Sequence, residues 1–130
     1  MRGGERYVSV MSTTSRPILL VETDARTVAL VQKTVEGLID AHPLVVFSDP
    51  DAVRRYLLDG TRRPVAILLN GQREGALSLM SWINSAIDTP VIYFGPYLGL
   101  PHFYRIDTLA EPLTEDVLTD ALNGVLAEAS

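Results

Sequence analysis

Polar residues that could do chemistry stand directly after short apolar runs of this sequence. They are two acids and a hydroxyl in Glu22-Thr23-Asp24, the amide Asn70, and the acid Glu111. Carboxylate and amide oxygens are ligands for hard divalent cations, and an ionised carboxylate is a nucleophile for group transfer. An amide is a very poor nucleophile, so Asn70 lacks the reactivity that an aspartate would have in its place.

Other kinds of reactive site are poorly represented. The sequence has no cysteine, which excludes disulfides, thiolate catalysis and cysteine-ligated metals. Its two histidines, His42 and His102, fall near an expected helix end and in an expected loop, which favours surface or turn roles. No glycine-rich phosphate loop follows residues 18–21, where Glu22 and Asp24 would repel a phosphate.

Composition bounds the class of protein. The chain has 130 residues, 47% of them hydrophobic, and a net charge of -5, which suits one compact domain and argues against binding to nucleic acid. No apolar run is long enough to cross a membrane, and the lack of cysteine fits a cytoplasmic location.

The first residues have a different character from the rest. Residues 1–15 are charged or small, without the apolar stretch of a secretory signal, and Met11 begins a second plausible start. We expect residues 1–15 to form a flexible N-terminal arm and residues 16–130 to form the domain. The alternative is an ordered arm that docks on a partner.

The elements that must position the polar residues alternate along the chain. Apolar runs predict strands at 18–21, 44–47, 65–69, 90–94 and 106–109, the last one weak and at a sheet edge. Amphipathic segments predict helices at 26–40, 51–58, 75–87 and 114–127. Asp49 before Pro50, and Thr114 before two acids, mark two helix starts.

Each helix is expected to bury one apolar stripe. The stripes are Val28, Val31, Val35, Leu38 and Ile39; Val53, Tyr56 and Leu57; Leu77, Met80, Ile83 and Ile87; and Val117, Leu118, Ala121, Leu122 and Val125. Strands that alternate with helices imply right-handed crossovers and a parallel sheet. We therefore expect a flavodoxin-like α/β fold, a three-layer sandwich whose five-stranded sheet has the order 2-1-3-4-5.

One segment breaks this alternation. Residues 95–104 contain two prolines and two glycines, which leave little room for a regular helix. We expect the fourth helix to be shortened or absent. The aromatic residues there either fill the vacated space or form an exposed patch that binds a partner. The candidate interface comprises Tyr97, Leu98, Leu100, Phe103 and Tyr104.

The polar residues should meet at one edge of the sheet, since ligands of open parallel sheets bind outside the carboxyl ends of the strands. The residues delivered there are Glu22, Thr23, Asp24, Asn70, Gly95 and Glu111. Each acid also has a purely structural explanation. Asp24 could cap the first helix, and Glu22 and Glu111 could be solvated loop residues.

Residues 17–128 resemble a CheY-like receiver domain of bacterial two-component signalling. The resemblance rests on the order and spacing of residues 18–22, 51–57 and 89–92 and of Pro112, none of which is specific alone. It implies that the Glu111–Pro112 bond is cis, because the corresponding bond of the family usually is.

The departures from the family fall on its active positions. The resemblance implies a phosphate-accepting aspartate where Asn70 stands and two magnesium-binding acids where Glu22 and Thr23 stand. It implies a hydroxyl residue where Gly95 stands and a lysine where Glu111 stands. Each change removes a part of phosphoryl transfer, namely the nucleophile, a metal ligand, a hydrogen-bond donor or a cation. Conventional phosphorylation is therefore not expected.

Two weaker expectations concern the same pocket. Magnesium could still bind weakly through Glu22, Asp24 and the side-chain oxygen of Asn70, and no other cofactor is expected. Glu111 could accept hydrogen bonds from Asn70 or Thr23 and hold the pocket in one state.

The sequence thus predicts a non-enzymatic pseudo-receiver that signals through protein–protein contact with an unnamed partner or as a homodimer. It is similar to the atypical receivers of flagellar transcription regulators and circadian-clock proteins. Two alternatives stay open. One is a conventional phosphorelay response regulator with an altered phosphosite, for which Asp24 is the nearby candidate. The other is a flavodoxin-like domain that binds a small ligand such as a flavin or nucleotide.

Overall fold

A computed structural model describes residues 16–38, 41–59, 63–71, 74–87, 89–94, 106–109 and 113–129, with only the backbone at 84, 106–109, 128 and 129. Five parallel strands form one sheet in the order β2-β1-β3-β4-β5. The strands are β1 (Ile18–Val21), β2 (Leu44–Phe47), β3 (Ala66–Asn70), β4 (Val91–Phe94) and β5 (Ile106–Leu109). This confirms the predicted flavodoxin-like sheet.

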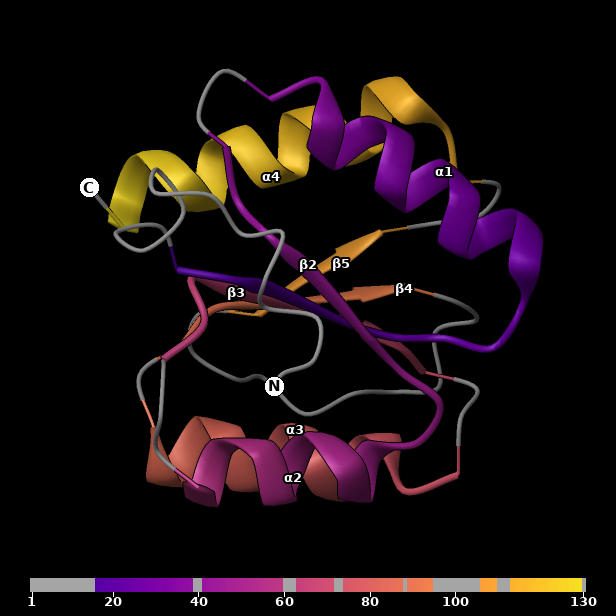
Figure 1. Ribbon diagram of the computed structural model, residues 1–130. Helices are drawn as coiled ribbons and strands as arrows, with labels where there is room; N and C mark the ends of the chain where they lie inside the picture. The colour runs from indigo at the N-terminus through magenta and orange to yellow at the C-terminus, as the bar shows by residue number, and fades with distance from the viewer. Residues whose placement is uncertain are drawn as a thin grey trace.

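Four helices cover the two faces of the sheet. They are α1 (Ala25–Glu36), α2 (Pro50–Asp59), α3 (Ala76–Ala86) and α4 (Glu115–Ala129). Figure 1 shows α1 and α4 on one face and α2 and α3 on the other, which is the expected three-layer arrangement. The structure describes no helix between β4 and β5; residues 95–105, where we expect a shortened or absent fourth helix, lie outside the described residues.

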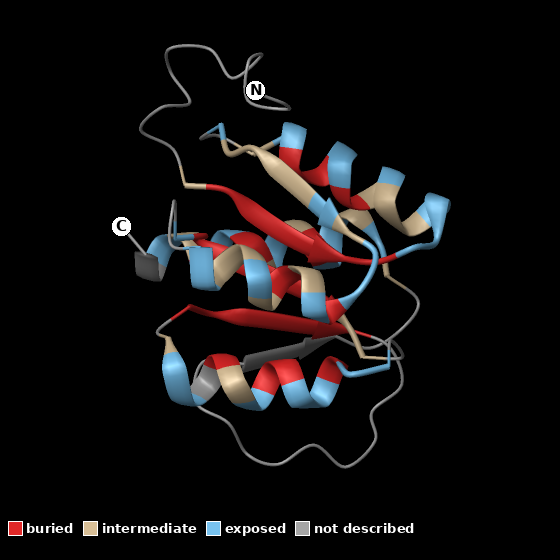
Figure 2. Ribbon diagram, turned by 60° about the horizontal axis from the view of Figure 1, so that its bottom comes forward, coloured by how far each residue is buried: buried red, intermediate tan, exposed pale blue. Residues whose placement is uncertain are grey.

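The core is divided by the sheet into two clusters. Side chains alternate along each strand, so Leu20 and Leu68 pack beneath α1 and α4, whereas Leu19 and Ile67 pack beneath α2 and α3. Strands β1 and β4 are buried along their whole length, and β3 is buried up to its last residue, Asn70, which is half-buried (Figure 2). Continuous burial on both faces explains why their sequences are unbroken apolar runs.

The predicted helix stripes are mostly correct, with two exceptions. Leu77 is 50% exposed and Val117 is 38% exposed, so neither belongs to the core. In α3 the buried face instead runs through Ala76, Leu79 and Ile83, and Leu77 lies beyond its edge. Ile39 lies outside the described residues.

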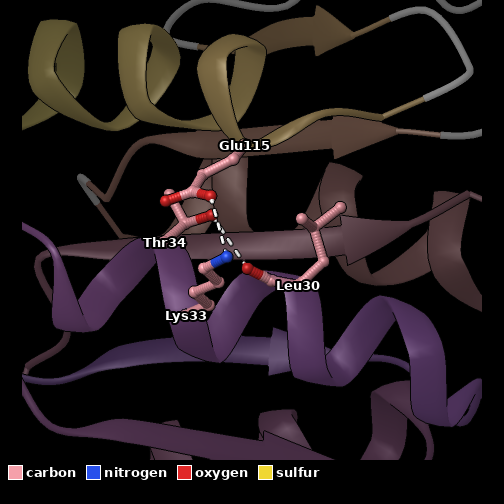
Figure 3. Close-up of polar contacts among 4 residues, drawn as sticks. All are labelled: Leu30, Lys33, Thr34 and Glu115. Atoms are coloured by element: carbon pink, nitrogen blue, oxygen red, sulfur yellow. Dashed lines mark hydrogen bonds and ion pairs between the residues drawn. The ribbon is translucent and has the colours of Figure 1, made fainter.

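Helices α1 and α4 lie side by side. Val31 and Val35 of α1 and Leu118 of α4 belong to the same apolar core cluster, which joins the two helices. Figure 3 shows one polar contact between the two helices, in which Lys33 Nζ lies 3.6 Å from Glu115 Oε1, and one within α1, where the Thr34 hydroxyl donates to the Leu30 carbonyl at 2.8 Å. The ion pair is exposed, so we expect it to add less than about 1 kcal/mol to stability.

Side-chain caps begin the helices at the predicted places. The Asp49 carboxylate accepts from the Ala52 amide at 2.9 Å ahead of α2, and the Thr114 hydroxyl accepts from the Val117 amide at 3.2 Å ahead of α4. Such caps satisfy amides that have no partner within the helix.

Candidate functional site

The register of the sheet brings Glu22 beside Asn70. Val21 of β1 pairs with Leu69 of β3, so the next residues of the two strands are neighbours across the strand ends. The Glu22 amide continues the ladder by donating to the Phe47 carbonyl of β2 at 3.1 Å. Glu22 is therefore held by the backbone on one side and faces β3 on the other.

The Glu22 carboxylate is buried and accepts three N–H groups. Its Oε1 accepts from Asn70 Nδ2 at 2.8 Å, and its Oε2 accepts from the backbone amides of Thr23 and Asp24, each at 2.9 Å. Glu22 is only 4% exposed, so the alternative that it is a solvated loop residue is wrong. Burial of the carboxylate is offset by these donors, since a buried charge is costly only when it lacks partners.

The side-chain amide of Asn70 makes its interaction with Glu22 favourable, because it supplies a hydrogen-bond donor. A carboxylate can only accept hydrogen bonds, so a donor is required opposite Glu22 Oε1. An aspartate at position 70 would bring a second carboxylate to within hydrogen-bonding distance of the first. Two carboxyl groups at that distance cannot both be ionised without a large cost in free energy.

Asp24 is turned towards its own helix. Its Oδ2 accepts from the Thr27 amide at 3.0 Å and from the Thr27 hydroxyl at 2.9 Å, which confirms it as the N-cap of α1. The Thr27 hydroxyl and then the Thr27 amide lower the pKa of Asp24 from 3.8, with a smaller contribution from Arg26.

The arrangement of these acids does not fit a magnesium site. Both carboxylate oxygens of Glu22 already accept hydrogen bonds from N–H groups. Asp24 Oδ2 accepts a hydrogen bond from the Thr27 amide. Magnesium requires near-octahedral oxygen ligands, so a cation would have to displace these donors. Within the described ranges, no three His, Cys, Asp or Glu side chains are grouped so that they could hold a metal.

Tyr93 is a neighbour of this edge that the sequence did not single out. A Cβ added to Gly71 would overlap the ring and hydroxyl of Tyr93, and the Gly71 amide donates to the Phe94 carbonyl at 2.8 Å. Burial raises the pKa of the Tyr93 phenol. The glycine that directly follows Asn70 was the available signal, because a glycine at a strand end often marks a close approach.

The remaining predicted site residues cannot be placed. Those outside the described residues are Gly95, Glu111, Pro112, Tyr97, Leu98, Leu100, Phe103 and Tyr104. The cis bond, the aromatic interface and the contact of Glu111 with Asn70 or Thr23 therefore stay predictions. What the structure does join at one edge is Glu22, Asn70 and the backbone of residues 23–24.

Comparison with known proteins gives no sequence family. No protein-family model matches the chain, and no curated protein matches it. Among the described residues, no helix has the length and apolar character needed to cross a membrane.

Solved structures, in contrast, are similar over nearly the whole chain. The signal receiver domain of an HD domain-containing protein from Pseudomonas fluorescens Pf-5 has a TM-score of 0.72 at 18% identity, covering 88% of this chain and 97% of its own. The phosphorylated cyanobacterial phytochrome response regulator RcpA has a TM-score of 0.73 at 19% identity, covering 90% and 98%.

A third neighbour comes from a transcription regulator. The two component transcriptional regulator AraC from Clostridium phytofermentans ISDg has a TM-score of 0.66 at 17% identity, covering 87% of this chain and 93% of its own. Together these likenesses show that the chain has the fold of response-regulator receiver domains.

Proposed function

We propose that this chain is a pseudo-receiver, a signalling domain that acts through protein–protein contact without being phosphorylated. The observation that carries the proposal is the 2.8 Å hydrogen bond from Asn70 Nδ2 to the buried Glu22 carboxylate. At the strand end where the resemblance implies an attacking aspartate, the side chain is an amide that donates to an acid.

Electrostatics at this edge support the same conclusion. Phosphoryl transfer to a carboxylate needs a nucleophile, a divalent cation and a positive group that neutralises the phosphoryl oxygens. Here Asn70 contacts the carboxylate of Glu22, and a second acid, Asp24, lies two residues after Glu22 in the chain. An incoming phosphoryl donor would meet negative charge.

A receiver without a phosphorylation switch can still present a fixed surface to a partner. We place that surface on residues 96–105 and the last helix, where exposed Val117 of α4 supports the assignment. The partner is a signalling protein or a second copy of the chain. Such contacts need neither a bound cofactor nor catalysis.

The decisive experiment is incubation with acetyl phosphate and magnesium, read by intact mass spectrometry beside an ordinary receiver as positive control. We expect no gain of a phosphoryl group. A gain at Asp24, mapped by peptide fragmentation, would instead establish the relocated phosphosite. A coloured preparation, or a bound flavin or nucleotide released on denaturation, would favour the small-ligand alternative.

The contact surface is tested separately. Alanine replacement of Tyr97, Phe103 and Tyr104 should weaken self-association or partner binding, measured by sedimentation and by titration. Leu58→Ala is the matched control, because Leu58 is a large exposed apolar residue on α2, away from α4. If both variants associate as the wild type does, the surface lies elsewhere.

A further inference from the structure

The outer edge of β2 is unusually apolar for an edge strand. Among the described strands β2 pairs only with β1, so its other side carries unpaired backbone groups. Its sequence, Leu44-Val45-Val46-Phe47, has no charge and no proline, and Val46 is 43% exposed. Natural edge strands are normally protected by charges, prolines, bulges or a covering segment. Apart from its short length of four residues, a covering segment is the protection that this sequence leaves open.

A groove runs beside this edge on the face that carries α1. It has a volume of about 560 Å³. Apolar side chains of α1 and β2 line it, including Val35, Leu44 and Val46, while Glu36 and His42 add polar groups. The edge and the groove together offer backbone hydrogen bonds and apolar side-chain contacts, which is how a sheet takes up an added strand.

The backbone groups that face outward can be identified. The carbonyls of Pro43 and Phe47 accept from the Ile18 and Glu22 amides of β1, so these residues point inward. Alternation along the strand then directs the amides and carbonyls of Leu44 and Val46 to the open side.

The chain itself supplies a candidate occupant next to the groove. His42 Nδ1 lies 2.9 Å from the carbonyl oxygen of Arg16, and the Arg16 side chain donates to the carbonyls of Arg63 and Pro64 at 3.2 and 2.8 Å. Arg16 is thereby fixed beside a residue that lines the groove. The fifteen residues before it must leave from this end of β2.

The sequence of those residues suits a strand. Residues 7–10 read Tyr-Val-Ser-Val, rich in aromatic and β-branched types, and residues 12–15 read Ser-Thr-Thr-Ser. The outer position lies about 10 Å from β1, two strand spacings away, and four extended residues span about 13 Å. Arg2 and Arg6 also complement the negative charge of Glu36.

We infer that residues 7–10 add to the outer edge of β2 as an antiparallel strand and cover the groove against α1. The direction follows from the chain path, because the arm must end near the start of β2 to enter β1. The inference is independent of the proposed function, since the outer edge of β2 carries neither Glu22 nor Asn70.

Amide hydrogen exchange of the full chain, followed residue by residue by NMR, tests this. We expect the Val46 amide to be protected, and Val8→Pro to speed its exchange by about tenfold or more, because a proline in the added strand cannot donate to the ladder with β2. Gly3→Pro, outside the proposed strand, is the matched control and should leave Val46 unchanged. The Leu20 and Leu68 amides report whether the central sheet stays folded.

Two results would overturn the inference. One is an unprotected Val46 amide in the full chain, which would mean that nothing covers the edge. The other is protection that Val8→Pro leaves intact and that rises with protein concentration, which would assign the edge to a second copy of the chain.

Discussion

Asn70 Nδ2 lies 2.8 Å from Glu22 Oε1, and this bond joins the carboxyl ends of β3 and β1. The pair is directional, because the amide donates and the carboxylate can only accept. Glu22 is simultaneously fixed by the backbone amides of Thr23 and Asp24. The amide at position 70 is therefore matched to its neighbour, and an aspartate there should be harmful.

Asn70→Asp should lower the free energy of unfolding at neutral pH by about 1–3 kcal/mol, because it replaces a hydrogen bond by two facing carboxylates. One of the two would retain a proton in the folded state at a pH where the unfolded chain has lost it. Since the folded state then binds the proton more tightly, the loss of stability should shrink as pH falls from neutral towards about 4 and should be smallest below that pH. Urea denaturation of the wild type and the variant, at neutral pH and below about pH 4, measures this difference in stability.

The control for that variant is Asn123→Asp, the same chemical change at an exposed position of α4. It should change stability by less than about 0.5 kcal/mol. Asn70→Asp should also remain unphosphorylated by acetyl phosphate. A variant that is as stable as the wild type and accepts phosphate would contradict the role given to the Asn70–Glu22 pair.

Exchanging the two groups should restore part of the lost stability. In the double variant Glu22→Gln/Asn70→Asp, the new amide can donate to the new carboxylate while its oxygen still accepts a backbone amide. We expect a favourable coupling of about 0.5–3 kcal/mol in a double-mutant cycle measured by urea denaturation. Strict additivity of the two single changes would show that the side chains do not interact.

Magnesium should not bind at this edge, because the oxygens of Glu22 and the Oδ2 of Asp24 already accept N–H or hydroxyl groups. A titration to millimolar magnesium, followed by amide NMR, should leave the resonances of residues 22–24 and 70–71 in place. Calcium serves as a second probe with looser geometric demands. Saturable shifts confined to these residues would revive the weak site predicted from the sequence.

Asp24 gives the protein a pH dependence of opposite sign to that of the Asn70→Asp variant. Its pKa in the folded chain is lowered from 3.8, chiefly by the Thr27 hydroxyl and amide. Its contribution to stability is thus complete above 3.8 and is lost as pH falls through the lower folded value. Asp24→Asn keeps a capping side chain without the charge, so the stability difference between wild type and variant should narrow below that pH. The matched control is Asp120→Asn, the same chemical change at an exposed position of α4.

The fold was predictable because its strongest signals are local. Unbroken apolar runs matched β1 and β2 to the residue, the weaker pattern at 106–109 matched β5, and Asp24, Asp49 and Thr114 marked helix starts. The Glu22–Asn70 bond was not predicted, although both residues were expected at one edge. Its formation depends on the register between β1 and β3 and on three donors that together bury a carboxylate, and neither is visible in a pattern of apolar residues. Leu77 was misplaced because an apolar residue at the margin of a helix stripe fits either side.

Gly71 should be intolerant of any side chain, for reasons of packing. A Cβ there would overlap the Tyr93 ring, which is buried between the sheet and α3 and cannot move without leaving a cavity. Gly71→Ala should therefore lower the free energy of unfolding by about 1–3 kcal/mol through overpacking.

Gly124→Ala makes the same change on α4, where the new methyl group meets nothing within 4 Å. That control should raise stability by about 0.5–1 kcal/mol, because alanine favours the helix. Opposite signs for the two glycines, measured by urea denaturation, would establish that Tyr93 holds the chain closely just after Asn70. A neutral Gly71→Ala would show that the loop after β3 can move away from the ring.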